Sequence, residues 1–267
     1  MVPRLPRVAF TIVLNGERHL QHNDFAGQVL SMVDHWSIVE GASLSGGSTS
    51  WCWEMPPQYH QDGRSIDGTI KYLKDLSQRH SSLHVNVGTG MWSSKDQMVN
   101  IGLDSLRQEV ASFPCFLWEF DVDEQWVAGD LLAAEQMLWQ NRLTAALFSS
   151  NQYVGPHLVA RGAWGSNMGR LYLWGGEPFI SHEPPRLERV ERTGLLPQRF
   201  NHYSYYWEED VQFKSLWYRG HEQVYKNWKR LQQQESSDFP QPLTALFGEG
   251  SEYARDSWIE WINIPAP

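Results

Sequence analysis

The chain has 267 residues, of which 41% are hydrophobic and 20% charged, a composition typical of a globular protein with one large domain. Its formal net charge of -9 argues against binding to naked nucleic acid, which needs clustered lysine and arginine. The two cysteines, Cys52 and Cys115, are too few for a disulfide framework or a thiolate metal site.

The first predicted element is a strand at residues 7–15, RVAFTIVLN, because this run is apolar and rich in β-branched side chains. The run is too short to cross a membrane and lacks the small-residue cleavage site of a signal peptide. We therefore expect a cytoplasmic protein with no membrane partner.

Three more apolar runs predict strands: SIVEGA at 37–42, HVNVG at 84–88 and FPCFLWEF at 113–120. Two amphipathic helices are predicted between them, one capped by Asp67 and one at residues 96–110. Strands that alternate with helices predict right-handed βαβ units, and therefore an α/β fold with a mainly parallel sheet flanked by helices.

The remaining segments are less regular. Residues 41–65 form a long predicted loop rich in Gly, Ser, Trp and Pro, and loops of this length are usually functional or disordered. The pattern becomes irregular after residue 150, and residues 232–242 are predicted to be an exposed connection. No boundary between independent domains is evident, so residues 1–267 are interpreted as a single domain.

Acidic residues gather where the predicted strands end. Asp121, Asp123 and Glu124 follow the strand at 113–120 directly, and Glu40 lies near the end of the second strand. Ligands of open parallel sheets bind outside the carboxyl ends of the strands. The sequence therefore predicts the ligand site at this edge of the sheet.

Asp121 and Asp123 are two residues apart, so on an extended chain their side chains point to the same side. At ~5 Å and an effective dielectric of 20, two such charges repel by roughly 3 kcal/mol. A raised pKa on one acid, a bound divalent cation or a fully solvated acidic turn would each relieve this repulsion. Oxygen ligands with few cysteines favour Mg²⁺ or Mn²⁺ over zinc.

Four stretches follow one another along the chain: SIVEGAS (37–43), KDQMVNIGLDSL (95–106), FDVDE (120–124) and NHYSYYWEEDVQFKSL (201–216). In this order they resemble segments of family seventeen of the glycosyltransferases, the group that includes the bisecting N-acetylglucosaminyltransferases. The resemblance covers roughly residues 35 to 220. It departs from the family at Gln125-Trp126, where Ile-Pro is usual, and at Asn201, where Trp usually precedes the histidine. These departures concern the acceptor more than the fold.

The resemblance implies a GT-A fold, a Rossmann-like mainly parallel sheet, with 1–126 as the nucleotide-sugar half and 127–267 as the acceptor side. It also implies a divalent cation, Mn²⁺ or Mg²⁺, bound by the D-x-D acids Asp121 and Asp123. His202 is the third candidate ligand, since GT-A enzymes commonly complete the metal site with a downstream histidine.

Further donor-binding candidates lie near the predicted site. By resemblance, Asp121 contacts the nucleotide ribose, and Glu40, Lys95 and Asn15 are the other residues predicted to bind the nucleotide sugar. His182 is the reserve candidate for the metal. For Lys95, the structural alternative is a solvated side chain in the first turn of the helix.

The segment LYLWGGEPF contains Trp174-Gly175-Gly176-Glu177, in which two glycines let the backbone approach a ligand and leave the carboxylate exposed. A similar segment in galactosyltransferase-like GT-A enzymes places its acid on the acceptor hydroxyl. Glu177 is therefore the first candidate for the general base, followed by Glu209 and Asp210. The alternative for Glu177 is an exposed acid in a hairpin turn.

These patterns predict a metal-dependent glycosyltransferase. It would transfer a sugar from a nucleotide-sugar donor, first of all a UDP-sugar, to a hydroxyl acceptor, and the family resemblance implies inversion of configuration. Two other functions stay open. One is a non-catalytic carbohydrate-binding protein with a structural cation, whose tryptophans would stack on sugar rings. The other is a nucleotidyltransferase, although the Gly-rich phosphate loop expected near its first strand is missing.

Overall fold

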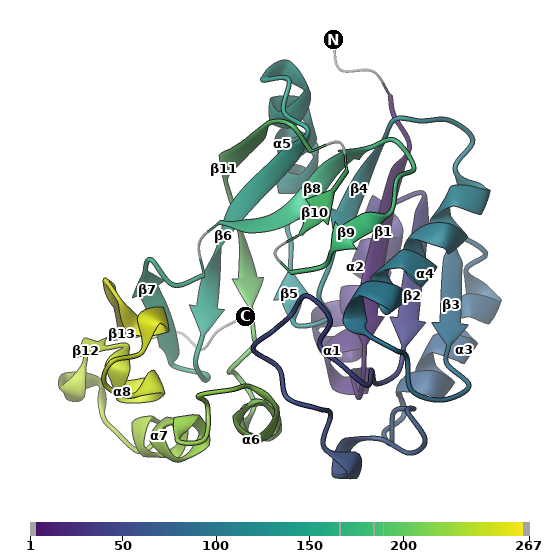
Figure 1. Cartoon of the computed structure of the whole chain (residues 1–267). Helices are drawn as coiled ribbons and strands as arrows, with labels where there is room; N and C mark the ends of the chain where they lie inside the picture. Colours follow the sequence, from purple (N-terminus) through teal and green to yellow (C-terminus); the bar gives the residue numbers. More distant parts are fainter. Residues whose placement is uncertain (1–3, 166, 184, 189, 264–267) are drawn as a thin grey trace. The chain divides into compact units, whose positions relative to one another are not determined.

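A computed structural model describes residues 4–165, 167–183, 185–188 and 190–263 (Figure 1). The chain forms two compact units, which are described separately. Unit 1 comprises Met1–Val122, Val127–Leu147 and Gly169–Leu196, and unit 2 comprises Asp123–Trp126, Phe148–Met168 and Pro197–Pro267. The units therefore alternate along the chain. The prediction of one domain, with halves that meet after residue 126, stays a prediction.

The helices and strands of unit 1 are β1 (Arg7–Val13), α1 (Glu17–Gln21), α2 (Phe25–Met32), β2 (His35–Glu40), α3 (Thr69–Arg79), β3 (Leu83–Val87), α4 (Lys95–Glu109), β4 (Cys115–Glu119), α5 (Ala128–Gln140), β9 (Phe179–Ser181) and β10 (Arg186–Leu187). Those of unit 2 are β5 (Glu124–Gln125), β7 (Leu158–Gly162), α6 (Glu208–Trp217), α7 (Val224–Leu231), β12 (Gln241–Pro242), α8 (Thr244–Phe247) and β13 (Ser257–Trp261). Three strands begin in one unit and end in the other: β6 (Ala145–Tyr153), β8 (Met168–Trp174) and β11 (Thr193–His202).

The strands of unit 1 follow the spatial order β8-β4-β1-β2-β3, and β4, β1, β2 and β3 are parallel (Figure 1). Val8 in β1, for example, lies between His35 of β2 and Leu117 of β4. At the end of this order β8 runs antiparallel to its neighbour β4. The four predicted strands, the two predicted helices and the mainly parallel α/β fold are thus confirmed in unit 1.

Helices cover both faces of this sheet. One face packs against α4, where Phe10 and Leu117 share a core cluster with Leu103. On the other face Trp36 contacts Phe25 of α2, at 5.9 Å between ring centroids. Every residue of β4 is buried, which explains why its sequence is continuously apolar before the acids begin.

The two predicted helices begin in different ways. The hydroxyl of Ser94 caps α4 by accepting a hydrogen bond from the backbone N–H of Gln97 at 3.1 Å. The N-cap of α3 is Gly68, so the prediction of Asp67 at this position is wrong by one residue. Asp67 still contributes to this turn, because its carboxylate accepts a hydrogen bond from the N–H of Thr69 at 2.9 Å.

The loop predicted at 41–65 is present and contains only one short helical turn, Pro57–Tyr59. It begins at Gly41 with φ +133°, and a Cβ there would lie 2.8 Å from the carbonyl oxygen of Gly63. The loop thus starts with a turn that requires glycine and closes back on itself beside the end of β2.

Unit 2 consists mainly of antiparallel strands and short helices. β13 lies between β7 and β12, and the end of β11 pairs with β5. A core cluster that includes Val211, Trp228 and Leu246 joins α6, α7 and α8. The sequence did not predict the strands after residue 150, because several have one exposed face and lack a continuous apolar run. In the described ranges, no helix of either unit has the length and apolar character needed to span a membrane.

Candidate functional site

The carboxyl ends of the parallel strands of unit 1 bring three predicted residues to one edge of the sheet. Glu40 is the last residue of β2 and pairs with Val13 at the end of β1. Asn15 follows β1, and Asp121 follows β4. The strand order reverses between β1 and β4, since β2 and β3 lie on one side of β1 and β4 on the other. Such a reversal is where ligands of open α/β sheets bind.

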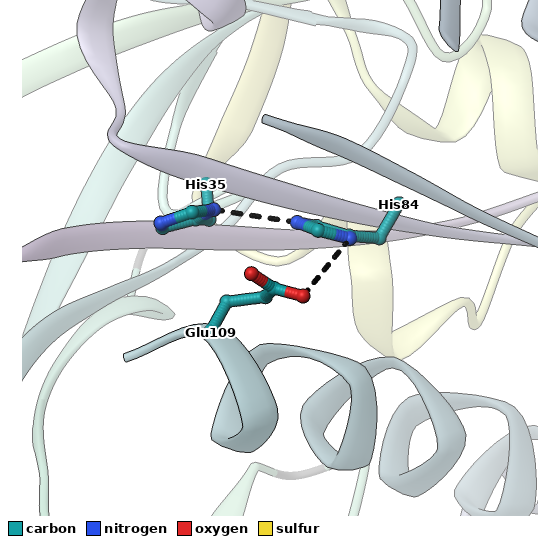
Figure 2. Close-up of side chains that lie close together, drawn as sticks. All are labelled: His35, His84 and Glu109. Carbon is teal, nitrogen blue, oxygen red and sulfur yellow. Dashed lines mark hydrogen bonds and ion pairs between the residues drawn. The ribbon is translucent and has the colours of Figure 1, made fainter. Parts of the chain in front are cut away.

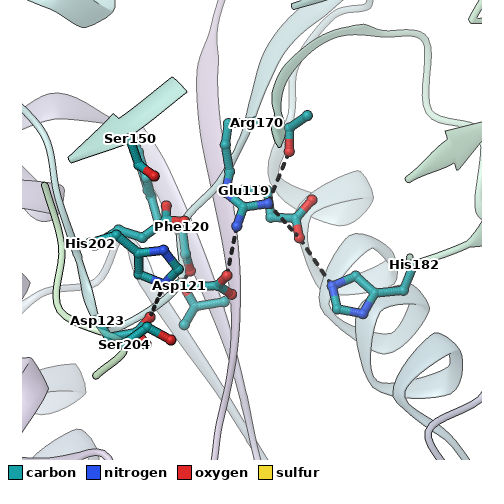
Figure 3. A network of polar contacts seen from close by, with 12 residues as sticks. Glu119, Phe120, Asp121, Asp123, Ser150, Arg170, His182, His202 and Ser204 are labelled. Carbon is teal, nitrogen blue, oxygen red and sulfur yellow. Dashed lines mark hydrogen bonds and ion pairs between the residues drawn. The ribbon is translucent and has the colours of Figure 1, made fainter. Parts of the chain in front are cut away.

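Asp121 is held by a buried arginine (Figure 3). The guanidinium of Arg170, in β8, donates to Asp121 at 2.8 Å and lies 3.5 Å from the carboxylate of Glu119. The Arg170 and Glu119 side chains are 7% and 2% exposed, whereas Asp121 is 35% exposed. Arg170 therefore neutralises two carboxylates, and only that of Asp121 reaches solvent.

His182 continues this network in unit 1 (Figure 3). Its Nε2 lies 3.0 Å from Glu119 Oε1. Burial by itself lowers the pKa of His182, but the hydrogen bond and charge of Glu119 outweigh burial and raise it. In the described ranges, His182 Nδ1 and Glu119 Oε2 are buried without a hydrogen-bond partner. A buried site with unmatched polar atoms is one where a ligand or water gains hydrogen bonds.

Asn15 and Glu40 hold the 41–65 loop and the segment after it. Asn15 donates to the carbonyl of Tyr59 at 2.6 Å and accepts from the N–H of Ile66 at 2.8 Å. Glu40 Oε1 accepts from the N–H of Ser65 at 2.7 Å. Burial raises the pKa of Glu40, and its Oε2 has no hydrogen-bond partner in the described part of the chain. Both residues thus shape the edge, and Glu40 keeps one oxygen available.

The first turn of α4 binds the same loop. Asp96 accepts hydrogen bonds from the N–H and hydroxyl of Ser48, at 2.8 and 2.6 Å, and from the N–H of His182 at 2.8 Å. The ammonium of Lys95 lies 3.7 Å from the sulfur of Cys52, also in the loop. Lys95 and His182 therefore belong to one neighbourhood of unit 1.

Glu177 lies elsewhere in unit 1. Because β8 is antiparallel to β4, Trp174 at its end pairs with Cys115 at the start of β4. Glu177 follows in a turn where its backbone carbonyl accepts from the Trp174 indole at 2.6 Å. Asp121 is six residues beyond Cys115 on an extended chain, roughly 20 Å away. The structure therefore does not bring Glu177 to the edge where Asp121 lies.

In unit 2, Asp123 has two basic neighbours. Its Oδ1 lies 3.4 Å from His202 Nε2, as Figure 3 shows, and its Oδ2 lies 3.3 Å from the ammonium of Lys214. His202 is at the end of β11, where it pairs with Glu124 of β5. The predicted pair of Asp123 and His202 thus meets within one unit.

The surroundings of His202 determine which of its nitrogens carries the proton. Its Nδ1 lies 2.9 Å from the amide nitrogen of Gln152, which also donates to Ser150 at 2.8 Å. With this amide orientation Nδ1 accepts, so Nε2 carries the hydrogen that faces Asp123. Binding of a metal at Nε2 would require this proton to leave or move to Nδ1.

The other candidate bases lie on α6. Glu209 and Asp210 are in its first turn, and Lys214 follows one turn later on the same helix. Lys214 also donates to the carbonyl of Ser204 at 2.8 Å and to its hydroxyl. The buried side of α6 therefore contacts Asp123 through Lys214.

The chemistry of Asp123 and His202 fits the predicted cation, because carboxylate oxygen and imidazole nitrogen are both ligands of Mn²⁺. The ammonium of Lys214 opposes a cation there, and the Asp121 charge is balanced by Arg170 within unit 1. A divalent ion would have to displace Lys214 from Asp123. The metal stays a prediction.

Sequence reasoning missed Arg170, Lys214 and Glu119. Arg170 and Glu119 each lie inside an otherwise apolar segment, MGRLYLW and FLWEF respectively, and Lys214 lies in the mixed segment VQFKSLW. A charge inside a buried element needs a partner of opposite charge, and this signal was present in the sequence. The sequence did not show which residue is the partner.

No family model and no curated protein matches the sequence. Among solved structures, residues 1–349 of TarS from S. aureus match with a TM-score of 0.46 and 12% identity, covering 79% of this chain and 64% of that one. The same fragment in complex with UDP-GlcNAc matches with a TM-score of 0.45 and 12% identity, covering 79% of this chain and 65% of that one. A nucleoside-diphosphate-sugar pyrophosphorylase from Vibrio cholerae matches with a TM-score of 0.29 and 8% identity, covering 87% of this chain and 81% of that one. The chain thus spans less than two thirds of the TarS fragment. With TM-scores below 0.5, these likenesses assign neither a family nor an activity to it.

Proposed function

We propose that this protein is a nucleotide-sugar-dependent glycosyltransferase of the GT-A type that transfers a sugar to a hydroxyl acceptor. The observation that carries the proposal is the edge of unit 1 where the strand order reverses between β1 and β4, with Asp121 following β4. Open α/β sheets commonly bind nucleotides where the strand order reverses. Family-seventeen-like specificity and inversion of configuration are the finer parts of the proposal.

Within unit 1, each charged group has a distinct part in the proposal. Asp121 is the acid with access to solvent, and Arg170 fixes its orientation, so it suits a hydrogen bond to a ribose hydroxyl. Lys95 and His182 supply positive charge for a diphosphate. Glu40, whose pKa is raised by burial, keeps an oxygen without a hydrogen-bond partner among the described residues.

Within unit 2, Asp123 and His202 would hold the divalent cation. When bound, such an ion neutralises the charge that develops on the departing diphosphate. A carboxylate must also take the proton of the acceptor hydroxyl. Glu209 and Asp210, on the helix that carries Lys214, are the proposed bases, because Glu177 lies at the opposite edge of its sheet from Asp121.

The rival functions differ in what they bind. A carbohydrate-binding module is usually all-β, whereas unit 1 is an α/β sheet with parallel strands, so this structure favours a nucleotide ligand. A nucleotidyltransferase would bind a nucleoside triphosphate together with a sugar phosphate. Titration with nucleoside triphosphates and, separately, with nucleotide sugars distinguishes a nucleotidyltransferase from a glycosyltransferase.

The test is calorimetric titration with UDP, GDP and their sugar conjugates, with and without Mn²⁺. We expect a nucleotide to bind at least tenfold more tightly with Mn²⁺, and Asp123→Ala to abolish this gain without unfolding the protein. Circular dichroism checks the fold, and Asp104→Asn, on the exposed side of α4, is the control. Binding by Asp123→Ala equal to that of the parent would refute the metal assignment, and failure of every nucleotide to bind would refute the function.

A further inference from the structure

A second cluster of metal-binding side chains lies at the other edge of the sheet of unit 1. His35 is the first residue of β2, His84 is the second residue of β3, and Glu109 is the last residue of α4 (Figure 2). These are the amino ends of the parallel strands, opposite the carboxyl ends followed by Asn15 and Asp121. The cluster is therefore separate from the edge proposed to bind the nucleotide.

The geometry suits a small divalent ion. His35 Nδ1 lies 3.3 Å from His84 Nε2, and one donor atom from each of the three residues lies within 4.8 Å of the others. Two nitrogens bound to a tetrahedral ion at about 2.0–2.1 Å are separated by about 3.3 Å. Among the residues that the structure describes, this is the one group of three His, Cys, Asp or Glu side chains so arranged.

The local charge and exposure also suit a cation. The carboxylate of Glu109 is 3.9 Å from His84 Nδ1, the ring nitrogen that does not face His35, and its side chain is 41% exposed. Glu109 would therefore turn to reach an ion held between the two histidines. A neutral imidazole offers its lone pair to a metal.

We propose that His35, His84 and Glu109 form a zinc site that joins the end of α4 to the first residues of β2 and β3. Two imidazoles and one carboxylate favour Zn²⁺ over Mg²⁺, which prefers oxygen ligands. The ion would replace the hydrogen bond between the two histidines with two bonds to nitrogen and one to oxygen. The competing explanation is a hydrogen-bonded pair of neutral histidines that binds no metal.

The experiment is calorimetric titration of tag-free protein with ZnCl₂ near pH 7.5, in the Asp123→Ala background so that Zn²⁺ binding at Asp123 does not contribute. One equivalent of Zn²⁺ per chain is expected to bind. Replacing His84 with Gln should weaken this binding at least tenfold, a loss typical even for residues that only orient a ligand. Co²⁺ is expected to give the visible absorption of a tetrahedral ion, which the variant lacks.

The controls separate metal binding from folding. Asp104→Asn lies on the same helix as Glu109, and His80→Gln removes another histidine of unit 1, so both should bind Zn²⁺ like the parent. Zn²⁺ should raise the thermal midpoint of the parent but not that of Glu109→Gln. Because the Glu109 side chain is 41% exposed, this variant should fold even if His84→Gln does not. MgCl₂ should leave the midpoint unchanged.

Two results would overturn the proposal. One is the absence of a stoichiometric Zn²⁺ site in the Asp123→Ala background. The other is equal Zn²⁺ binding by Glu109→Gln or His84→Gln in that background, which would place the ion elsewhere. Nucleotide binding plays no part in either outcome, so the zinc site and the proposed transferase activity succeed or fail separately.

Discussion

Asp121 and Asp123 are separated by one residue, yet the two units give them different surroundings. Asp121, in unit 1, is bound by a guanidinium that is itself buried and shared with Glu119. Asp123, in unit 2, faces the imidazole of His202 and the ammonium of Lys214 on its flexible four-carbon stem. The first carboxylate is fixed by a rigid planar partner, whereas the second has a lysine partner that an ion could displace.

The difference shows that the two acids of a short motif need not have the same role. A carboxylate already neutralised by a buried Arg170 has little to gain from a cation, since its charge is compensated within the fold. A carboxylate whose partners are a lysine and a histidine can exchange the lysine for an ion that the histidine also binds. We therefore assign nucleotide contact to Asp121 and metal binding to Asp123 in the proposed transferase.

The largest effect is expected from Arg170→Met, which removes the guanidinium that Glu119 and Asp121 share. Glu119 would lose the guanidinium beside it and keep its hydrogen bond with His182, and Asp121 would lose Arg170 as well. Loss of one partner from a buried ion pair costs about 3–5 kcal/mol. Urea denaturation should show this decrease in the free energy of unfolding.

A matched change in unit 2 checks that burial causes the effect. Arg161 pairs with Glu260 at 3.2 Å, with side chains that are 36% and 42% exposed. Arg161→Met should cost about 1 kcal/mol or less, as for other exposed pairs. Equal losses for Arg170→Met and Arg161→Met would contradict the distinction drawn for Asp121.

The next effect is expected from Lys214→Met, which tests whether the partners of Asp123 are displaceable. Loss of the hydrogen bonds to Asp123 and Ser204 should lower the free energy of unfolding by about 1–3 kcal/mol. If Asp123 binds Mn²⁺, the same change should strengthen Mn²⁺ binding, because the competing ammonium is gone. Calorimetry with MnCl₂ measures this, and weaker or unchanged Mn²⁺ affinity would argue against Asp123 as a ligand.

The smallest effect is a difference in pH dependence between buried histidines of the two units. The pKa of His182 is raised in the fold by Glu119, despite opposing burial, so its charged form stabilises unit 1. This stability is complete below the ordinary histidine pKa of about 6.5 and is lost as pH rises through the raised value. The difference in urea midpoint between the parent and His182→Gln should therefore shrink as pH rises from the ordinary histidine pKa through the raised value.

His221 in unit 2 should show the opposite trend. Burial lowers its pKa, and its Nε2 lies 3.0 Å from the hydroxyl of Tyr205. Its neutral form stabilises the fold above the ordinary pKa, and this contribution is lost as pH falls through the lowered value. The midpoint difference between the parent and His221→Gln should grow with pH, and parallel trends for both histidines would contradict these assignments.

Much of unit 1 could be predicted from local patterns. The strands that became β1 to β4 are apolar runs, α4 has a helical period, and the acids follow strand ends, all of which are properties of neighbouring residues. The strands of unit 2 were not predicted, because several bury only one face in short antiparallel pairs. Glu177 is the first candidate for the general base from sequence, but the direction of β8 beside β4 places it at the other edge from Asp121, and strand direction has no local signature.

The sequence alone determined the α/β character of unit 1 and which edge of its sheet carries the acids. Only the tertiary structure decided which basic residues reach them. Arg170 is 49 residues from Asp121, His182 is 63 from Glu119, and Lys214 is 91 from Asp123. Such pairings depend on strand order and on how distant elements pack, whereas periodicity and capping depend on residues within a few positions of one another.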